Sequence, residues 1–413
     1  MANTIKDLQG ERLGLCVSGG LDSRSIARKL RELEIDVVCF TADLAQPDET
    51  DVNNIKVRMA ACDVETVIID LKDTMAAACF EVIKTQATYD GGYWNTTGIA
   101  RAVTVHGLLA AMQDRGCTVL AHGATGRGND QVRFERYTNV LAPKMKVYSP
   151  WRDPVLLAEF PGRKQMAEYL VKFNIFTAAE GTKRYSTDAN LAGLSHEAED
   201  LESLETPCTI VGPTMGVWPH EAPDELEAVN VTFDRAQAVA INGKAVTPLE
   251  AMRSANTIAG RNGIGMKNAL ENRIVGTKSR GVYEAPGMEL FGFCLQQVYQ
   301  AVLDRRSGQL FWHLSALVAG QIYDGRYFDP ATRAARTAID VFAEHANGTV
   351  HVGLYKGNIY FHKLQDCPAS IYNEADSSME ASDGLNPESS QGFVEIQSVE
   401  ARSLANAGQI VDR

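Results

Sequence analysis

The alternation of short apolar runs with helical segments between residues 13 and 175 restricts the fold more than any other feature. Four mainly apolar runs predict buried strands, at 13–17, 37–41, 67–71 and 117–121. Four amphipathic segments predict helices, at 22–33, 51–62, 72–87 and 99–115. Strands that are apolar on both faces need helices on both sides of their sheet. This half therefore predicts a doubly wound α/β domain with a mostly parallel sheet.

The pattern changes from about residue 180. Two short runs, at 229–233 and 238–241, predict strands. Asn242-Gly243 lies between Ile241 and Ala245, and this dipeptide predicts a type I′ hairpin. A second hairpin is predicted at 349–363, and three helices are predicted at 288–305, 310–321 and 331–346. We therefore predict three parts: the α/β domain at 1–176, an α+β domain at 177–370, and a tail at 371–413 in which a polar linker over 371–392 precedes a C-terminal helix.

Charge and cysteine usage exclude several classes of protein. The chain has 40 Lys and Arg against 52 Asp and Glu, a formal charge of −12, and no basic stripe, which argues against nucleic acid as a partner. No apolar run reaches the roughly 18 residues that a membrane span needs. Residues 1–6 lack the apolar core of a signal peptide, so we expect a cytoplasmic protein. None of the eight cysteines forms a C-x-x-C pair, which favours buried free thiols over disulfides or zinc.

The segment from Ser18 to Ser23 joins the first predicted strand to the first helix and reads Ser-Gly-Gly-Leu-Asp-Ser. Adjacent glycines let backbone N–H groups approach phosphate oxygens, and a helix N-terminus adds partial positive charge. Asp22 could orient the loop or help to hold Mg²⁺. This is neither a Walker A loop nor a G-x-G-x-x-G fingerprint. It resembles the pyrophosphate loop of the N-type ATP pyrophosphatases. The alternative is an ordinary turn with Ser18 or Asp22 as a helix cap.

Later segments of the sequence distinguish among the enzyme activities that share such a loop. In chain order they lie at 93–104, 121–135, 185–191, 195–197, 271–273 and 278–287. Together, from about residue 10 to 365, they resemble the bacterial branch of the argininosuccinate synthase family. The resemblance implies an ATP-dependent ligase that adenylates the ureido oxygen of citrulline, releases pyrophosphate, and lets the amine of aspartate displace AMP.

The same resemblance extends to cofactors, parts and partners. It implies ATP with Mg²⁺ as a substrate complex, no metal site made by protein alone, no tightly bound cofactor, and a homotetramer. It makes 1–176 the nucleotide-binding domain, 177–370 the synthetase and multimerisation domain, and the tail helix an oligomerisation element. A frayed tail is the alternative for that helix. Another AMP-forming ligase acting on a related ureido substrate, or a non-catalytic nucleotide sensor, remain alternative functions.

Site residues follow from the resemblance, position by position. Those matching the ATP site are Cys16, Val17, Ser18, Gly19, Gly20, Leu21, Asp22, Ser23, Arg24, Ala42, Gly123, Thr125, Asp130 and Asp188. Those matching the aspartate site are Thr125, Asn129 and Asp130. Those matching the citrulline site are Tyr93, Asn129, Arg133, Ser186, Ser195, Glu197, Glu271 and Tyr283. Catalytic roles fall on Asp22, Asp130 and Arg101.

The chemistry of the ligands agrees with this assignment. Citrulline needs a cation for its carboxylate, which Arg133 or Arg101 supplies, and acceptors for its ammonium group, which Glu197 and Glu271 supply. Other interpretations of single residues remain open. A surface ion pair would account for Glu271 with Arg273, core packing for Tyr283 and for Cys16, and a helix N-cap for Asn129-Asp130. His122 is interpreted as structural.

Two positions depart from the family pattern. Arg24 stands in the phosphate loop where the family often has Ser, and it either points into solvent or adds a phosphate contact. Ala45 stands where Gly is common after the second strand, which puts the shape of the turn beside adenine in doubt.

Overall fold

The computed structural model describes residues 4–175, 185–380 and 384–410. The chain divides into two compact units, Met1–Ala369 and Ser370–Arg413. The boundary predicted between 176 and 177 lies outside the described residues. Among the residues that the structure describes, no helix is long and apolar enough to cross a membrane.

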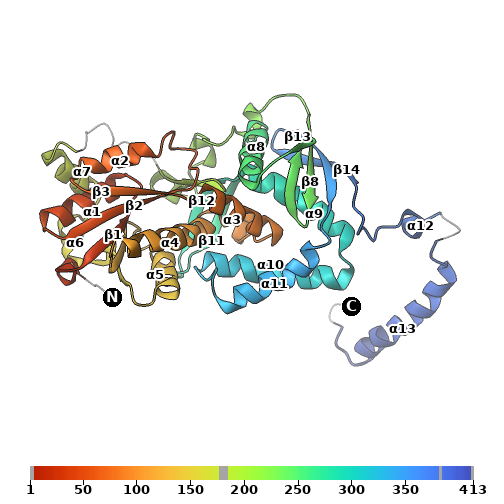
Figure 1. Cartoon of the computed structure of the whole chain (residues 1–413). Helices are drawn as coiled ribbons and strands as arrows, with labels where there is room; N and C mark the ends of the chain where they lie inside the picture. The colour runs from red at the N-terminus through yellow and green to blue at the C-terminus, as the bar shows by residue number, and fades with distance from the viewer. Residues whose placement is uncertain (1–3, 176–184, 381–383, 411–413) are drawn as a thin grey trace. The chain divides into compact units, whose positions relative to one another are not determined.

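A five-stranded parallel sheet organises the first half, in the order β3-β2-β1-β4-β5 (Figure 1). Its strands are Arg12–Cys16 (β1), Asp36–Asp43 (β2), Glu65–Asp70 (β3), Val119–His122 (β4) and Lys146–Tyr148 (β5). The helices of this half are Leu21–Glu32 (α1), Asn53–Ala60 (α2), Lys72–Lys84 (α3), Thr96–Asp114 (α4), Asp130–Leu141 (α5), Pro154–Glu159 (α6) and Arg163–Lys172 (α7). The predicted doubly wound α/β fold is confirmed.

Alternation along β2 explains why helices cover both faces of the sheet. Val37 and Cys39 pack into a core with α1, α2, α6 and α7, whereas Val38 and Phe40 pack into a core with α3 and α4. On the second face, a Cβ at Gly14 would lie 2.8 Å from the side chain of Met112. Only glycine therefore lets α4 approach β1 this closely.

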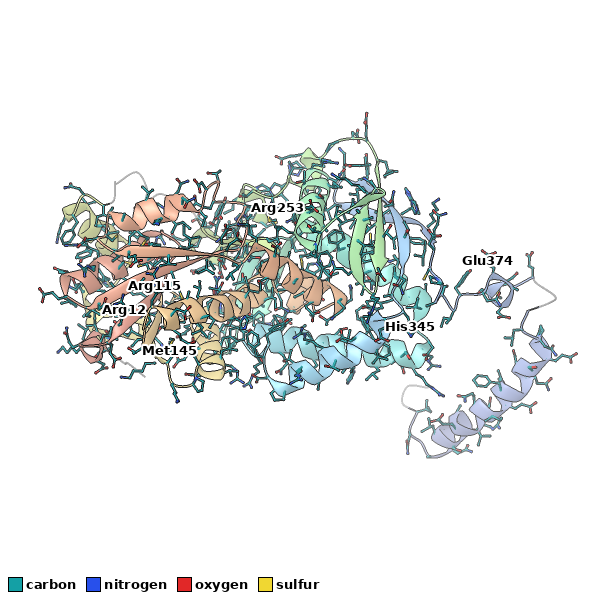
Figure 2. All side chains as sticks on the ribbon, viewed as in Figure 1. Arg12, Arg115, Met145, Arg253, His345 and Glu374 are labelled. Carbon is teal, nitrogen blue, oxygen red and sulfur yellow. The ribbon has the colours of Figure 1, made fainter. Side chains whose placement is uncertain are left out.

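The amino ends of the parallel strands carry exposed ion pairs. Arg12, labelled in Figure 2, pairs with Asp36 at 3.1 Å, where β1 and β2 begin. Exposed pairs of this kind contribute little to stability. The carboxyl ends of the same strands are left for the cavity described below.

A five-stranded antiparallel sheet in the second half has the order β10-β9-β8-β13-β14. Its strands are Glu227–Asp234 (β8), Gln237–Ile241 (β9), Lys244–Ala245 (β10), Gly348–Tyr355 (β13) and Asn358–Gln365 (β14). Asn242 and Gly243 have φ of 50° and 73°, as the predicted type I′ turn requires. The second predicted hairpin is also present and turns at Lys356-Gly357, with φ of 44° and 82°.

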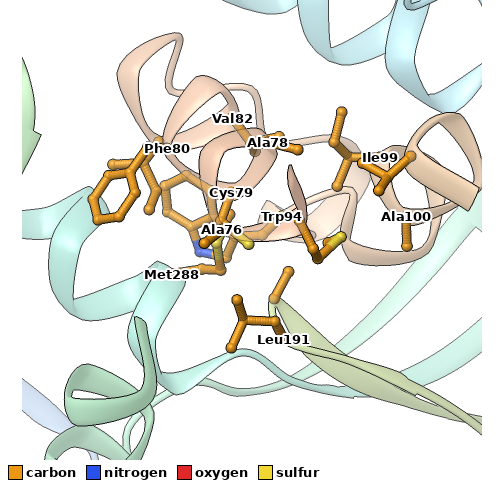
Figure 3. Close-up of a cluster of buried hydrophobic side chains, with 14 of the residues drawn as sticks. Ala76, Ala78, Cys79, Phe80, Val82, Trp94, Ile99, Ala100, Leu191 and Met288 are labelled. Atoms are coloured by element: carbon orange, nitrogen blue, oxygen red, sulfur yellow. The ribbon is translucent and has the colours of Figure 1, made fainter. Parts of the chain in front are cut away.

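Helices of the second half pack against the first half to form a shared core. They are Pro248–Arg261 (α8), Pro286–Val302 (α9), Arg305–Tyr323 (α10) and Pro330–Ala343 (α11). Figure 3 shows Phe80 of α3 and Trp94 close to Met288 of α9 and to Leu191. The indole Nε1 of Trp94 donates to Glu289 Oε2 at 2.7 Å. This continuous packing joins the second half to α3 and α4, the helices that cover one face of the parallel sheet.

A four-stranded antiparallel sheet, in the order β11-β12-β7-β6, completes the first unit. Its strands are Ser186–Asn190 (β6), Gly193–Glu197 (β7), Met266–Asn272 (β11) and Lys278–Glu284 (β12). It was not predicted as a sheet from the sequence, because these strands are short and rich in polar residues.

The second unit contains Glu374–Ser377 (α12) and Pro387–Asn406 (α13). The Asn386 side chain caps α13 by accepting from the N–H of Glu388 at 3.0 Å. The linker predicted over 371–392 is therefore too long, because α13 begins inside it. Phe393 and Ile396 of α13 are exposed.

Candidate active site

A cavity of about 1210 Å³ lies where the carboxyl ends of β1 and β2 and the loop after β4 meet the four-stranded sheet. All of the predicted ATP, aspartate, citrulline and catalytic residues line it. In the sheet order, β1 and β4 are the neighbours at which the chain reverses its direction of winding. Ligands of open α/β sheets bind at such a point. The volume exceeds that of a typical single-ligand pocket, so the cavity has room for more than one molecule.

The loop after β1 has the geometry of an anion site. Gly19 has φ +74°, a conformation that favours glycine, and a Cβ there would lie 2.9 Å from Nε of the Arg58 side chain. Gly20 occupies the N-cap position of α1, which makes the alternative of a Ser18 or Asp22 cap wrong. The N–H of Ser18 donates to Ser23 Oγ at 3.1 Å, and this bond closes the loop.

Asp22 lies in the first turn of α1 and faces the cavity. Burial raises the pKa of its carboxyl group, and Arg163 opposes that shift. A cation or a hydrogen-bond donor on a ligand would remove part of this cost. Cys16, which also lines the cavity, is buried, and burial raises the pKa of its thiol to about 12, so packing accounts for it better than nucleophilic chemistry.

The two departures from the family pattern have clear positions. Arg24 is 6% exposed and donates from Nη1 to Ile175 O at 3.1 Å, so the alternative in which it points into solvent is wrong. Ala45 has φ +54°, in the left-handed region that favours glycine. Gln46 closes this turn, because its Nε2 donates to Ala42 O at 2.8 Å and its Oε1 accepts from Leu44 N at 2.9 Å.

One face of the four-stranded sheet carries six of the predicted residues. Strand register places Ser186 opposite Glu197, and Asp188 and Tyr283 on either side of Ser195. Glu271 lies on β11 opposite Ser279. It is two residues from Ala269, whose cross-strand partner Gly281 also pairs with Glu197, so Glu271 and Glu197 are on the same face of the sheet. Because side chains alternate along a strand, all six point to the same side, toward the cavity.

Arg101 connects the two walls of the cavity. Its Nε lies 2.9 Å from Asp130 Oδ2, and its Nη2 lies 2.6 Å from Asp188 Oδ2. Arg133 adds a third contact, with Nη1 2.8 Å from Asp130 Oδ1. Burial alone would raise the pKa of Asp130, but the guanidinium groups of Arg101 and Arg133 hold it below its usual range. Asp130 therefore stays ionised.

Glu271 and Glu197 are the acidic groups on the predicted citrulline side. Glu271 is 4% exposed on a strand, and its Oε2 accepts from Tyr323, so the interpretation as a surface ion pair with Arg273 is wrong. Its Oε1 is buried without a hydrogen-bond partner among the described residues. Burial raises its pKa. Such an oxygen needs a donor, and the ammonium group of a ligand would supply one.

Glu197 pairs loosely with Arg273, at 3.6 Å between Oε2 and Nη2. Burial, together with the charge of Asp130, raises its pKa to about 7, and Arg273 opposes this. Its side chain retains 43% exposure and lines the cavity, so a ligand can reach it.

The remaining predictions concern aromatic and capping residues. Tyr283 is 7% exposed and stacks on Tyr93 at 4.2 Å between ring centroids, so it is packed as well as cavity-lining. Asn129 occupies the predicted N-cap position of α5, but its side chain makes no capping hydrogen bond. His122 is fully buried and stacks on Phe134 at 4.9 Å, as a structural role requires.

Several cavity-lining residues were not singled out from the sequence. Arg58 lies against Gly19 and pairs with Glu49, and Arg163 lies near Asp22. Both are on helices with no local motif, so only the folded arrangement reveals them. In the described part of the chain, no three or more His, Cys, Asp or Glu side chains gather as a metal site would require.

Comparison with known families gives matches to both halves of the chain. The profile described as "Arginosuccinate synthase N-terminal HUP domain" matches residues 12–175. The profile described as "Arginosuccinate synthase C-terminal domain" matches residues 185–404. The two profiles together cover every element that lines the cavity.

Complete proteins give the same result. An argininosuccinate synthase of Shewanella pealeana is 35% identical over 412 residues, which covers 98% of each chain. An argininosuccinate synthase of Rhodopirellula baltica is 36% identical over 391 residues, covering 94% of this chain and 96% of the relative.

Proposed function

The chain belongs to the argininosuccinate synthase family, and we propose that it joins citrulline to aspartate at the expense of ATP. ATP is opened between its α and β phosphates, so that the ureido oxygen of citrulline takes the adenylyl group and pyrophosphate leaves. The amine of aspartate then attacks the ureido carbon and displaces AMP. The products are argininosuccinate, AMP and pyrophosphate, as in arginine biosynthesis.

One observation carries this proposal. A single cavity joins an anion-binding loop at the start of α1 to a sheet face that bears Glu197, Glu271 and Ser195. The loop suits a triphosphate, and the sheet face suits an amino acid. A ligase that first activates one substrate with a nucleotide needs these two sites side by side.

On the nucleotide side, the N–H groups around Gly19 and the start of α1 bind the pyrophosphate portion. Mg²⁺ arrives with the nucleotide as Mg·ATP, as the family resemblance implies. Asp22 is the carboxylate in the first turn of α1. Its burial makes it fit a role beside that ion. A bound Mg²⁺ would neutralise charge that develops on the leaving pyrophosphate.

On the amino-acid side, Glu271 Oε1 and Glu197 accept hydrogen bonds from the ammonium group of citrulline. Arg133 supplies positive charge for the carboxylate of citrulline. Aspartate lies by the start of α5, where Thr125, Asn129 and Asp130 line the cavity. A helix N-terminus favours the carboxylates of this second substrate. Arg101 then stands between the subsites and stabilises charge on the adenylyl group.

We also propose the assembly and location that the family resemblance implied, a cytoplasmic homotetramer in which α13 takes part. The exposed apolar residues of α13 support an oligomerisation role. Light scattering on the full chain and on a chain ending at Ala369 tests this. Loss of the tetramer only in the shorter chain is expected, and a monomeric full chain contradicts the assignment.

The deciding experiment uses purified protein with citrulline, aspartate and Mg·ATP. Over many turnovers, argininosuccinate, AMP and pyrophosphate should form in equal amounts, and this sustained formation should require all three substrates. Release of ADP contradicts cleavage between the α and β phosphates. ATP binding without AMP formation favours the nucleotide sensor, and turnover only with a different ureido compound favours the related ligase.

A further inference from the structure

Tyr323 joins residues from both predicted amino-acid subsites. It ends α10 and is 1% exposed. Its hydroxyl accepts a hydrogen bond from Asn129 Nδ2 at 2.9 Å and donates one to Glu271 Oε2 at 2.6 Å. Asn129 belongs to both the predicted aspartate site and the predicted citrulline site, and Glu271 belongs to the predicted citrulline site alone.

The tyrosine ring is held firmly in place. Tyr89 stacks on it at 3.8 Å between ring centroids, and the guanidinium of Arg133 lies 4.9 Å from the ring centroid. The backbone carbonyl of Tyr323 accepts from Arg133 Nε at 2.9 Å. A ring packed in this way cannot change rotamer without disturbing Arg133, so the hydroxyl has one position.

The two partners of the hydroxyl are constrained at their other ends in different ways. Asn129 Oδ1 accepts from the N–H of Ile274 at 2.9 Å, which fixes the amide orientation. Glu271 Oε1 has no partner among the described residues. A ligand that binds Glu271 Oε1 therefore acts at the open end of a hydrogen-bond chain that runs through the Tyr323 hydroxyl and the Asn129 amide to the N–H of Ile274.

We propose that Tyr323 is a positioning residue that couples the citrulline and aspartate subsites through its hydroxyl. This inference rests on the proposed function. By linkage, a change that citrulline makes in the hydrogen bond between Glu271 and Tyr323 alters the affinity for aspartate at Asn129, and the reverse holds equally. Burial and the charge of Glu271 raise the pKa of Tyr323, so the hydroxyl remains a donor across the working pH range.

Tyr323→Phe tests the coupling, because it removes only the hydroxyl and keeps both ring contacts. The KM values for citrulline and for aspartate should each rise about five-fold or more, while the KM for ATP stays within about two-fold. The matched control is Tyr89→Phe, which keeps the stack and removes a hydroxyl that donates to Asn272 O at 3.0 Å. It should leave both amino-acid KM values unchanged.

A second variant keeps the test decisive if Tyr323→Phe does not fold. Glu271→Gln should raise the KM for aspartate as well as that for citrulline, although Glu271 belongs to the citrulline side. In the Tyr323→Phe background, Glu271→Gln should not raise the aspartate KM further, since the hydroxyl that connects Glu271 to Asn129 is already absent.

The outcomes separate this inference from the proposed function. Unchanged aspartate KM in either variant overturns the coupling, as does an equal rise in all three KM values, which indicates a purely structural role. If the wild-type protein forms no argininosuccinate from its three substrates, the proposed function fails and the coupling fails with it.

Discussion

Arg101 on α4 and Asp188 on β6 form an ion pair of 2.6 Å between Nη2 and Oδ2. The two residues come from opposite walls of the cavity, because α4 covers the parallel sheet and β6 is an edge strand of the four-stranded sheet. The other side of the same guanidinium holds Asp130. One cation thus fixes a carboxylate from each wall of the cavity.

Arg101→Lys should therefore reduce kcat by at least about ten-fold, because a lysine ammonium cannot hold two carboxylates in the geometry of a planar guanidinium. Pyrophosphate release under saturating substrates measures this. The matched control is Arg12→Lys, in an exposed Arg–Asp pair at the opposite ends of the strands. It should keep wild-type turnover, and equal losses in both variants would contradict a special role for Arg101.

Asp22→Ala should lose most activity by weakening the handling of Mg·ATP and pyrophosphate. The expected signature is a fall in kcat and a shift of the Mg²⁺ requirement to higher concentration, by about ten-fold or more. Asp114→Ala, at the exposed end of α4, is the control and should behave as wild type. Normal turnover of the Asp22 variant at all Mg²⁺ concentrations would rule out this role.

Much of the parallel half could be predicted because its strands are buried on both faces. Runs such as the one around Phe40 have no other stable environment than a covered sheet. Local turn chemistry was equally informative at Asn242-Gly243, since few dipeptides accept two positive φ angles.

The four-stranded sheet could not be predicted in the same way. The β6 residues Ser186 to Asn190 face a polar cavity on one side, so they lack the apolar alternation of a strand on a core. Contacts over long sequence separations are the other gap. Tyr323 lies 52 positions from Glu271 and 194 from Asn129, and no local pattern reports such a connection.

Citrulline binding should depend on pH through Glu197. Its pKa of about 7 means that the carboxylate, which accepts from the substrate ammonium, forms only as the pH rises through that value. The KM for citrulline should fall between about pH 6 and about pH 8, with no matching inflection in the KM for ATP. Glu197→Gln should abolish this pH dependence, and persistence of the inflection in that variant would assign it to another group.

Stability should respond to the same group with the opposite sign. The folded chain holds the Glu197 proton more tightly than the unfolded chain, whose pKa is near the ordinary 4.5. The stabilisation that comes from the bound Glu197 proton is therefore complete below a pH of 4.5 and is lost as the pH rises through about 7. The Tm of Glu197→Gln should rise relative to wild type with increasing pH. A difference in Tm that is independent of pH would show that ionisation is not the cause.

Ala45→Gly should stabilise the protein, although the change removes a methyl group. Ala45 has φ +54°, and a non-glycine residue there costs about 1 kcal/mol in backbone strain. Glycine loses more chain entropy on folding, so the expected net gain is smaller, about 0.5 kcal/mol in the free energy of unfolding. Urea denaturation measures it, with ATP absent so that ligand binding does not contribute. The same substitution at Ala77, exposed inside α3, should destabilise by about 0.5–1 kcal/mol. The free energy of unfolding should therefore rise with Ala45→Gly and fall with Ala77→Gly. A fall in both variants would mean that the backbone of the turn beside Ala42 is not strained.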